Sequence, residues 1–238
     1  MKVDKYKLKQ NIGVTIEEET ITRDVVELEE TYAKSTLIEK EDKKFGLINL
    51  PAFYFDMKDY GERNSATDVK KEIENHIKQY KVEYIYFWAD TFLAWSDDEF
   101  DQFCKMYSKI KLPFWCQTRI ETINEEKFRT LKDVGMDRIT FGLEHGNEDF
   151  RREVVKREYS NVDAIAKMRI ADKIRIPYSI NNIIGFPDET RELAFDTIEL
   201  NRQFNSDNTN CSILVPFHGT ELHKICVEKG YLDPNVIC

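Results

Sequence analysis

The chain has 238 residues, of which 41% are hydrophobic and 33% charged, as expected for a folded domain with a substantial buried core. Its net charge of −9 and pI near 5.2 exclude a general polyanion binder, because a phosphate backbone requires a basic surface, and no nucleic-acid partner is expected. No apolar run is long enough for a membrane span or a signal peptide, and five widely spaced cysteines predict a protein of the reducing cytoplasm.

Residues 1–44 differ from the rest of the chain. They contain the acidic run Glu17–Glu19, and apolar residues recur at helical spacing at Val25, Leu28 and Tyr32. The pattern predicts a helix over residues 21–38. We interpret the region as an acidic N-terminal appendage that could dock a protein partner, although such charge runs are usually just solvated faces.

From Phe45 onward, short runs rich in β-branched and aromatic residues alternate with amphipathic segments. The expected strands are Phe45–Leu50, Val82–Ala89, Pro113–Thr118, Arg138–Leu143, Tyr178–Ile184 and Cys211–Val215. The expected helices include Asp68–Tyr80, a helix opened by the capping box Ser96–Glu99, one from Asn124 to Gly135, Asn161–Lys173 and Arg191–Phe204.

A strand–helix repeat of about 30 residues predicts parallel strands joined by right-handed crossovers. Six units are present where a closed barrel needs eight, so the pattern leaves two architectures open: an incomplete barrel or an open doubly wound sheet. Both place ligand sites at the carboxyl ends of the strands.

Polar side chains next to small residues follow these strands. Glu144 could accept hydrogen bonds from an ammonium group or ribose hydroxyls, and Arg119 or Arg157 could clamp a carboxylate. A structural ion pair between a glutamate and an arginine is the alternative. We expect His145 and His218 to be hydrogen-bonding surface or loop residues rather than metal ligands.

Three stretches resemble the radical S-adenosylmethionine (SAM) superfamily, in particular its cobalamin-binding branch. They are FGLEHGNEDFRREVVKREYSN from Phe141, NNIIGFPDETRELAFDTIEL from Asn181 and VPFHGTELHKICVEKGYL from Val215. The run from Tyr60 to Phe92 also fits the family's first helix and second strand, so the resemblance covers about residues 60–232. It implies a partial (β/α)6 TIM-like barrel over residues 45–238, truncated at its C-terminus.

The resemblance also implies site residues and cofactors. SAM would be held by residues at five strand ends: Asp90, Thr91, Gln117, Arg119, Glu144, Arg157, Ile184, Gly185, Phe186, Pro216 and Phe217. Asp90 and Thr91 would offer backbone carbonyls to the ammonium, and Arg157 would pair with the carboxylate. Backbone groups from Ile184 to Phe186 would surround the adenine. The family's cofactor is a [4Fe–4S] cluster, and no cobalamin is expected on this chain, because 44 residues cannot form its domain.

The family's three-cysteine motif is missing. Its expected place after the first strand reads LPAFYFDMKDY, from Leu50 to Tyr60, and holds no cysteine. Since thiolates hold this kind of cluster, the catalytic residues stay unassigned and no metal ligand is proposed.

Four hypotheses remain. The chain could belong to a radical SAM enzyme whose cluster loop is lost or miscalled, which would cleave SAM reductively. It could instead be a non-catalytic barrel that binds SAM or a protein, a truncated gene product, or an unrelated barrel hydrolase or aldolase. No strand end offers the paired carboxylates or nucleophile–base pair that the last would need.

Overall fold

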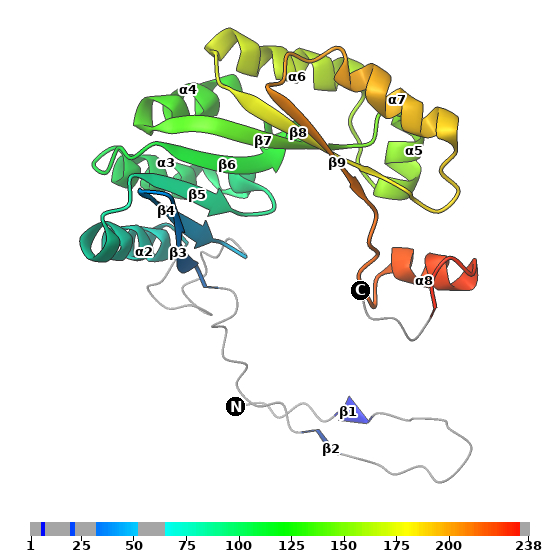
Figure 1. Cartoon of the computed structure of the whole chain (residues 1–238), viewed down its shortest axis with the longest axis horizontal. Helices are drawn as coiled ribbons and strands as arrows, with labels where there is room; N and C mark the ends of the chain where they lie inside the picture. The colour runs from blue at the N-terminus through cyan, green and yellow to red at the C-terminus, as the bar shows by residue number, and fades with distance from the viewer. Residues whose placement is uncertain (1–5, 8–19, 22–31, 52–64, 234–238) are drawn as a thin grey trace.

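The computed structural model describes residues 6–7, 20–21, 32–51 and 65–233. Its main feature is a seven-stranded sheet in the order β3-β4-β5-β6-β7-β8-β9. The strands are β3 (Lys34–Lys40), β4 (Lys43–Asn49), β5 (Tyr84–Trp88), β6 (Phe114–Arg119), β7 (Met136–Glu144), β8 (Tyr178–Ile184) and β9 (Asn208–Ile213). The sheet curls into half a barrel (Figure 1), with β4 to β9 mutually parallel and β3 antiparallel to β4. The six expected strands therefore correspond to β4 to β9, and the partial barrel is confirmed.

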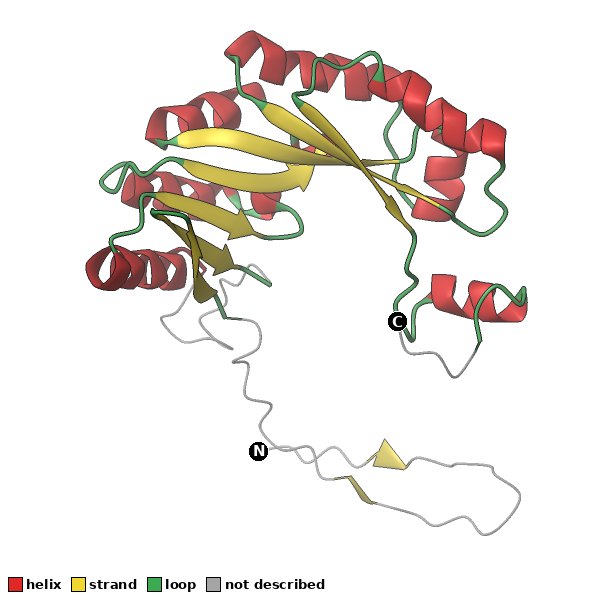
Figure 2. Ribbon diagram, in the orientation of Figure 1, coloured by secondary structure: helices red, strands yellow, loops and turns green. Residues whose placement is uncertain are grey.

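Helices cover the convex face of this sheet and leave its concave face open (Figure 2). They are α2 (Ser65–Tyr80), α3 (Asp97–Tyr107), α4 (Glu125–Val134), α6 (Asn161–Ile174) and α7 (Arg191–Asn201). Shorter elements are α5 (Glu148–Phe150), α8 (Glu221–Glu228), the 3-10 turns η2 (Phe92–Ala94) and η3 (Ile120–Thr122), and the π-helical η4 (Arg151–Val155). No helix among the described residues is long and apolar enough to cross a membrane.

The helix boundaries follow the local signals in the sequence. The Ser96 side chain accepts from the Glu99 amide while the Glu99 carboxylate accepts from the Ser96 amide, so the predicted capping box is present. Asn124 and Ser160 cap α4 and α6, where each side chain accepts from the backbone amide three residues further on. Gly135 ends α4 with φ of 130°, a conformation that L side chains rarely adopt.

One prediction in the N-terminal region is wrong. Residues 34–38 lie in strand β3, not in a helix, and pair with β4 from Lys34 opposite Asn49 to Lys40 opposite Lys43. The helical spacing failed there because the tight hairpin and its neighbouring sheet decide the conformation of so short a segment. Ile21 belongs to β2 (Thr20–Ile21), which pairs with β1 (Tyr6–Lys7), and residues 22–31 lie outside the described part of the chain.

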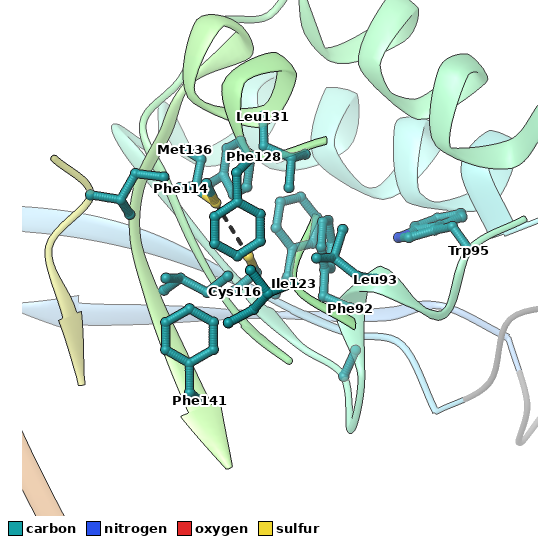
Figure 3. Close-up of a cluster of buried hydrophobic side chains, with 14 of the residues drawn as sticks. Phe92, Leu93, Trp95, Phe114, Cys116, Ile123, Phe128, Leu131, Met136 and Phe141 are labelled. Atoms are coloured by element: carbon teal, nitrogen blue, oxygen red, sulfur yellow. Dashed lines mark hydrogen bonds between the residues drawn. The ribbon is translucent and has the colours of Figure 1, made fainter. Parts of the chain in front are cut away.

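The core lies between the sheet and its helices. Figure 3 shows part of it, where Phe92, Phe114, Phe128 and Phe141 gather with Cys116, whose sulfur lies 3.9 Å from that of Met136. These six side chains are buried, four of them aromatic. Such large apolar side chains contribute most of the area removed from water, so this face holds the half-barrel together.

Candidate functional site

A cavity of about 1250 Å³ lies at the carboxyl ends of the parallel strands. Seven of the eleven predicted site residues line it: Asp90, Gln117, Arg119, Glu144, Arg157, Phe186 and Phe217. They come from β6, β7, the loops after β5 and β8, the segment after η4 and the segment after β9. The curl of the sheet thus places side chains from distant parts of the sequence around one hollow.

Glu144 occupies an unusual backbone position at the end of β7. Its φ is +68°, in the left-handed region, and the register of β7 against β8 shifts between Gly142 and Glu144. A β-carbon at Gly142 would overlap Glu144 Oε1, so the missing side chain there leaves room for the carboxylate to fold back. Such conformations cost about 1–3 kcal/mol and cluster at functional sites, which marks Glu144 as a candidate ligand-binding group.

Arg157 links two carboxylates beside the cavity. Its Nη1 lies 3.1 Å from Glu121 Oε1, and its Nη2 lies 3.4 Å from Glu144 Oε1. The Arg157 side chain is 15% exposed and that of Glu144 is 17% exposed. Burial raises the pKa of Glu144 above its ordinary value, while Arg157 and then Arg119 act in the opposite direction. The sequence left a structural ion pair and a ligand-binding role as alternatives. Arg157 is compatible with both, because it pairs with Glu144 and also lines the cavity.

The loop that carries Arg157 is held by a second, fully buried arginine. The Arg151 guanidinium donates to the carbonyls of His145 and Tyr159, both at 2.7 Å, and to Asn161 Oδ1 at 2.8 Å. It also lies over the Tyr159 ring, 4.1 Å from its centre. Arg151 could not be identified from the sequence, because nothing in its local sequence distinguishes it from the exposed Arg152 beside it.

His145 is a hydrogen-bonding residue of the loop after β7, as expected, and it is buried. Its Nδ1 accepts from the Asn147 amide at 3.1 Å, which makes Nε2 the protonated nitrogen, and Nε2 donates to Glu189 Oε1 at 3.0 Å. Glu189 Oε2 in turn accepts from the amides of Gly185 and Phe186. The loops after β7 and β8 are therefore joined, a contact between residues 44 positions apart that local sequence patterns cannot reveal.

Four predicted residues are not among those that line the cavity. The Ile184 side chain lines a smaller hollow of about 430 Å³ together with residues of β9 and α7, such as Cys211 and Phe195. The Gly185 amide is bonded to Glu189, and the Thr91 carbonyl accepts from the Ala94 amide at 2.9 Å. Pro216 is half-buried between the exposed Val215 and Phe217. Their predicted roles used mainly backbone groups, and these roles stay predictions.

The four cysteines in the described part of the chain do not fit a [4Fe–4S] cluster. Cys104, Cys116 and Cys226 are buried, Cys211 is exposed on β9, and Cys238 lies outside the described residues. Burial raises the pKa of Cys104 to about 12 and that of Cys116 further, so neither thiol readily becomes the thiolate that iron requires. In the part of the chain that the structure describes, no three His, Cys, Asp or Glu side chains are grouped to hold a metal ion.

Known proteins resemble this chain in fold and in sequence. The TsrM methyltransferase from Kitasatospora setae, described as a radical SAM enzyme with bound cobalamin and [4Fe–4S] cluster, has a TM-score of 0.60 and 16% identity, covering 71% of this chain and 32% of TsrM. An uncharacterised methyltransferase of Pyrococcus horikoshii is 25% identical over 178 residues, 73% of this chain and 38% of its own length. A biotin synthase of Persephonella marina is 28% identical over 47% of this chain and 32% of its own.

The chain spans about a third of the length of these curated relatives. The family model of the radical SAM superfamily matches residues 52–200, more than half of the chain. The match includes β5 to β8, Glu144 and Arg157. The chain belongs to the radical SAM superfamily.

Proposed function

We propose that the cavity at the carboxyl ends of the strands binds SAM. We further propose that this chain holds no iron–sulfur cluster with which to cleave the bound SAM. Membership of the superfamily supports SAM as the ligand. The observation that carries the proposal is the convergence of Glu144, Arg157 and Arg119 on one hollow, which offers a carboxylate and two guanidinium groups to a zwitterion.

Arg157 and Glu144 have separate roles in this proposal. Glu121 and Glu144 hold the Arg157 guanidinium in place from two sides. The ligand's carboxylate would replace one of these glutamates as the partner of Arg157. Glu144, released from Arg157, would accept from the ammonium group or the ribose hydroxyls. Arg119, which is exposed and has no ion pair within 4 Å among the described residues, adds a second cation at the same end.

The reductive step finds no support in the residues of this chain. Electron transfer to the sulfonium needs a cluster with thiolate ligands, and residues 50–65 contain no cysteine. The relatives called methyltransferase and biotin synthase show the range of chemistry in the superfamily, so neither activity is carried over.

Calorimetric titration with SAM tests the proposal. The Arg157→Ala variant should bind SAM roughly 10- to 100-fold more weakly, since a hydrogen bond to a charged group contributes about 1.5–3 kcal/mol. Arg152→Ala is the matched control, because Arg152 is exposed in η4, just before the segment that carries Arg157, and pairs with Asp149 and Glu153. Equal loss in both variants, or no binding by the unmodified chain, would contradict SAM binding.

Anaerobic reconstitution with iron and sulfide tests the second half of the proposal. We expect no retained iron and no 5′-deoxyadenosine after addition of SAM and a strong reductant. Stoichiometric iron with release of 5′-deoxyadenosine would show that the chain is a radical enzyme after all, whatever its affinity for SAM.

A further inference from the structure

Strand β9 forms one edge of the seven-stranded sheet, and among the described strands only β8 pairs with it. All six of its residues, Asn208–Ile213, are exposed. The backbone N–H and C=O groups along the outer side of an edge strand can pair with a further strand. Proteins commonly block such pairing with charged side chains, proline or a covering element.

The two edges of the sheet differ in this protection. Strand β3, at the opposite edge, carries Lys34, Glu39 and Lys40. Strand β9 reads NTNCSI and has neither a charged residue nor a proline. In a chain of net charge −9, β9 is therefore an edge at which two copies can meet without placing like charges opposite each other.

The helix that follows β9 does not cover this edge. Helix α7 lies over β8 and β9 on the convex face, whereas α8 lies apart from both (Figure 1). Helix α8 instead contacts the loop after β8, where Lys229 pairs with Asp188. The convex side of β9 therefore stays open beyond α7.

An apolar hollow of about 430 Å³ lies on that open side, between the sheet and α7. Its walls include Phe195 and Ile198 of α7, which are 48% and 52% exposed. The amides of Asn182 and Asn201, which also line it, donate to each other, so the groups left for an occupant are mainly apolar. Large exposed apolar side chains beside an unblocked edge are typical of a protein interface.

A second copy of the chain matches this edge. A two-fold axis normal to the sheet, passing beside Cys211, would pair β9 antiparallel with the β9 of the second copy and continue the sheet across the two. Because side chains alternate between the faces, Cys211 would then face its own counterpart on the convex side. Thr209 would face Ile213 on that side, and Asn210 would face Ser212 on the concave side. Each pair joins residues of similar polarity or shape.

The same symmetry would bring the two copies of α7 together. Neighbouring strands are about 4.8 Å apart, so a helix centred between β8 and β9 lies two strand spacings, about 10 Å, from its counterpart. Packed helices are about 8–10 Å apart, so the second α7 would cover Phe195 and Ile198. A separate peptide strand could pair with β9 but would leave these two side chains exposed. The spacing therefore favours a second copy.

We propose that this chain associates with a second copy of itself through antiparallel pairing of β9 and contact between the two α7 helices. The interface comprises six strand residues and a few apolar neighbours on each side, fewer than the roughly 20–30 residues of a standard-size interface. Association is therefore weak and reversible, with a dissociation constant of about 1–100 μM. The inference goes beyond the proposed function and does not depend on SAM binding.

Sedimentation velocity on the full chain at increasing concentration tests the interface. We expect a monomer–dimer equilibrium for the unmodified chain. Cys211→Lys and Cys211→Glu should each weaken dimerisation at least about 10-fold, because two like charges would lie directly opposite each other. An equal mixture of the two variants should recover a dimer, because the lysine of one then faces the glutamate of the other.

The matched control places the same charge on the opposite edge of the sheet. Thr36 is exposed on β3, so Thr36→Lys should dimerise like the unmodified chain. A monomer at every concentration, dimerisation that neither charge at residue 211 weakens, or no recovery in the mixture would overturn the proposal. Equal weakening by Thr36→Lys would also overturn it.

Oxidation by diamide tests the pairing of the strands without a charged variant. Cys104, Cys116 and Cys226 are buried, so a Cys238→Ser background leaves Cys211 as the exposed cysteine of the described residues. Diamide takes two electrons from two thiols and should link the copies, because directly opposite cysteines on antiparallel strands lie within disulfide distance. Cys211→Ser in that background should abolish the linked dimer. Absence of a reducible dimer before that substitution would contradict the pairing.

Discussion

The two faces of the same parallel strands differ in burial and in polarity. On the convex face Phe87, Phe114 and Phe141 have no exposed surface, and helices cover them. On the concave face the alternating residues Gln117, Gly142 and Asn181 border a cavity. Since successive side chains of a strand point to opposite faces, one stretch of sequence carries both stability and binding. Substitutions at neighbouring positions should therefore separate the two properties.

The largest effect is expected on the convex face, for Phe87→Ala. The Phe87 ring lies 5.2–5.9 Å, centre to centre, from those of Phe92, Phe103, Tyr107 and Phe114. Its removal should lower the free energy of unfolding by about 3–5 kcal/mol, through lost burial and the cavity left behind. Urea denaturation measures the change.

The adjacent residue serves as the control for that substitution. Trp88 points to the concave face and is half exposed, so Trp88→Ala should cost less than about 1 kcal/mol. Similar losses of unfolding free energy in both variants would contradict the assignment of stability to the convex face and binding to the concave face.

A smaller effect is expected on the concave face, for Gly142→Ala. The new β-carbon would displace the Glu144 carboxylate, the end of a flexible side chain, so unfolding free energy should change by less than about 1 kcal/mol. If Glu144 contacts SAM as proposed, affinity should fall roughly 3- to 10-fold, or about 0.7–1.4 kcal/mol.

A double-mutant cycle decides whether Gly142→Ala acts through Glu144. In a Glu144→Ala background the same glycine substitution should leave calorimetric SAM affinity unchanged, because no carboxylate remains to be displaced. An undiminished loss in that background would assign the effect to the backbone of β7.

The smallest effect concerns pH. Burial raises the folded-state pKa of Glu144 above its ordinary value of 4.5, so the folded chain holds this proton more tightly than the unfolded chain does. The contribution of the Glu144 proton to the free energy of unfolding is fully present below pH 4.5. It is lost as the pH rises through the pKa of Glu144 in the folded chain. Urea denaturation from pH 4 to 7 should show this loss in the unmodified chain relative to Glu144→Gln; parallel curves would contradict it.

Elements with strong local signals could be predicted from the sequence. Strand β8 was expected over the same residues that it occupies, and the Ser96 capping box and the Gly135 helix end depend on groups within a few residues. The strand β3 could not be predicted, because its conformation depends on pairing with β4. Seven cavity residues could be predicted from the strand ends and the family resemblance, whereas the contacts that hold Arg157 and Glu189 required coordinates.

By itself, the sequence determined six parallel strands with their covering helices, the polar character of the strand ends and the lack of cysteine in residues 50–65, directly after β4. Those properties follow from periodicity, capping and composition, which act over a few residues. Only the tertiary structure decided that Ile184 faces away from the large cavity, that His145 is buried against Glu189, and that Asn181 meets Asn210. These outcomes depend on the curl and register of the sheet, through which residues far apart in the chain come into contact.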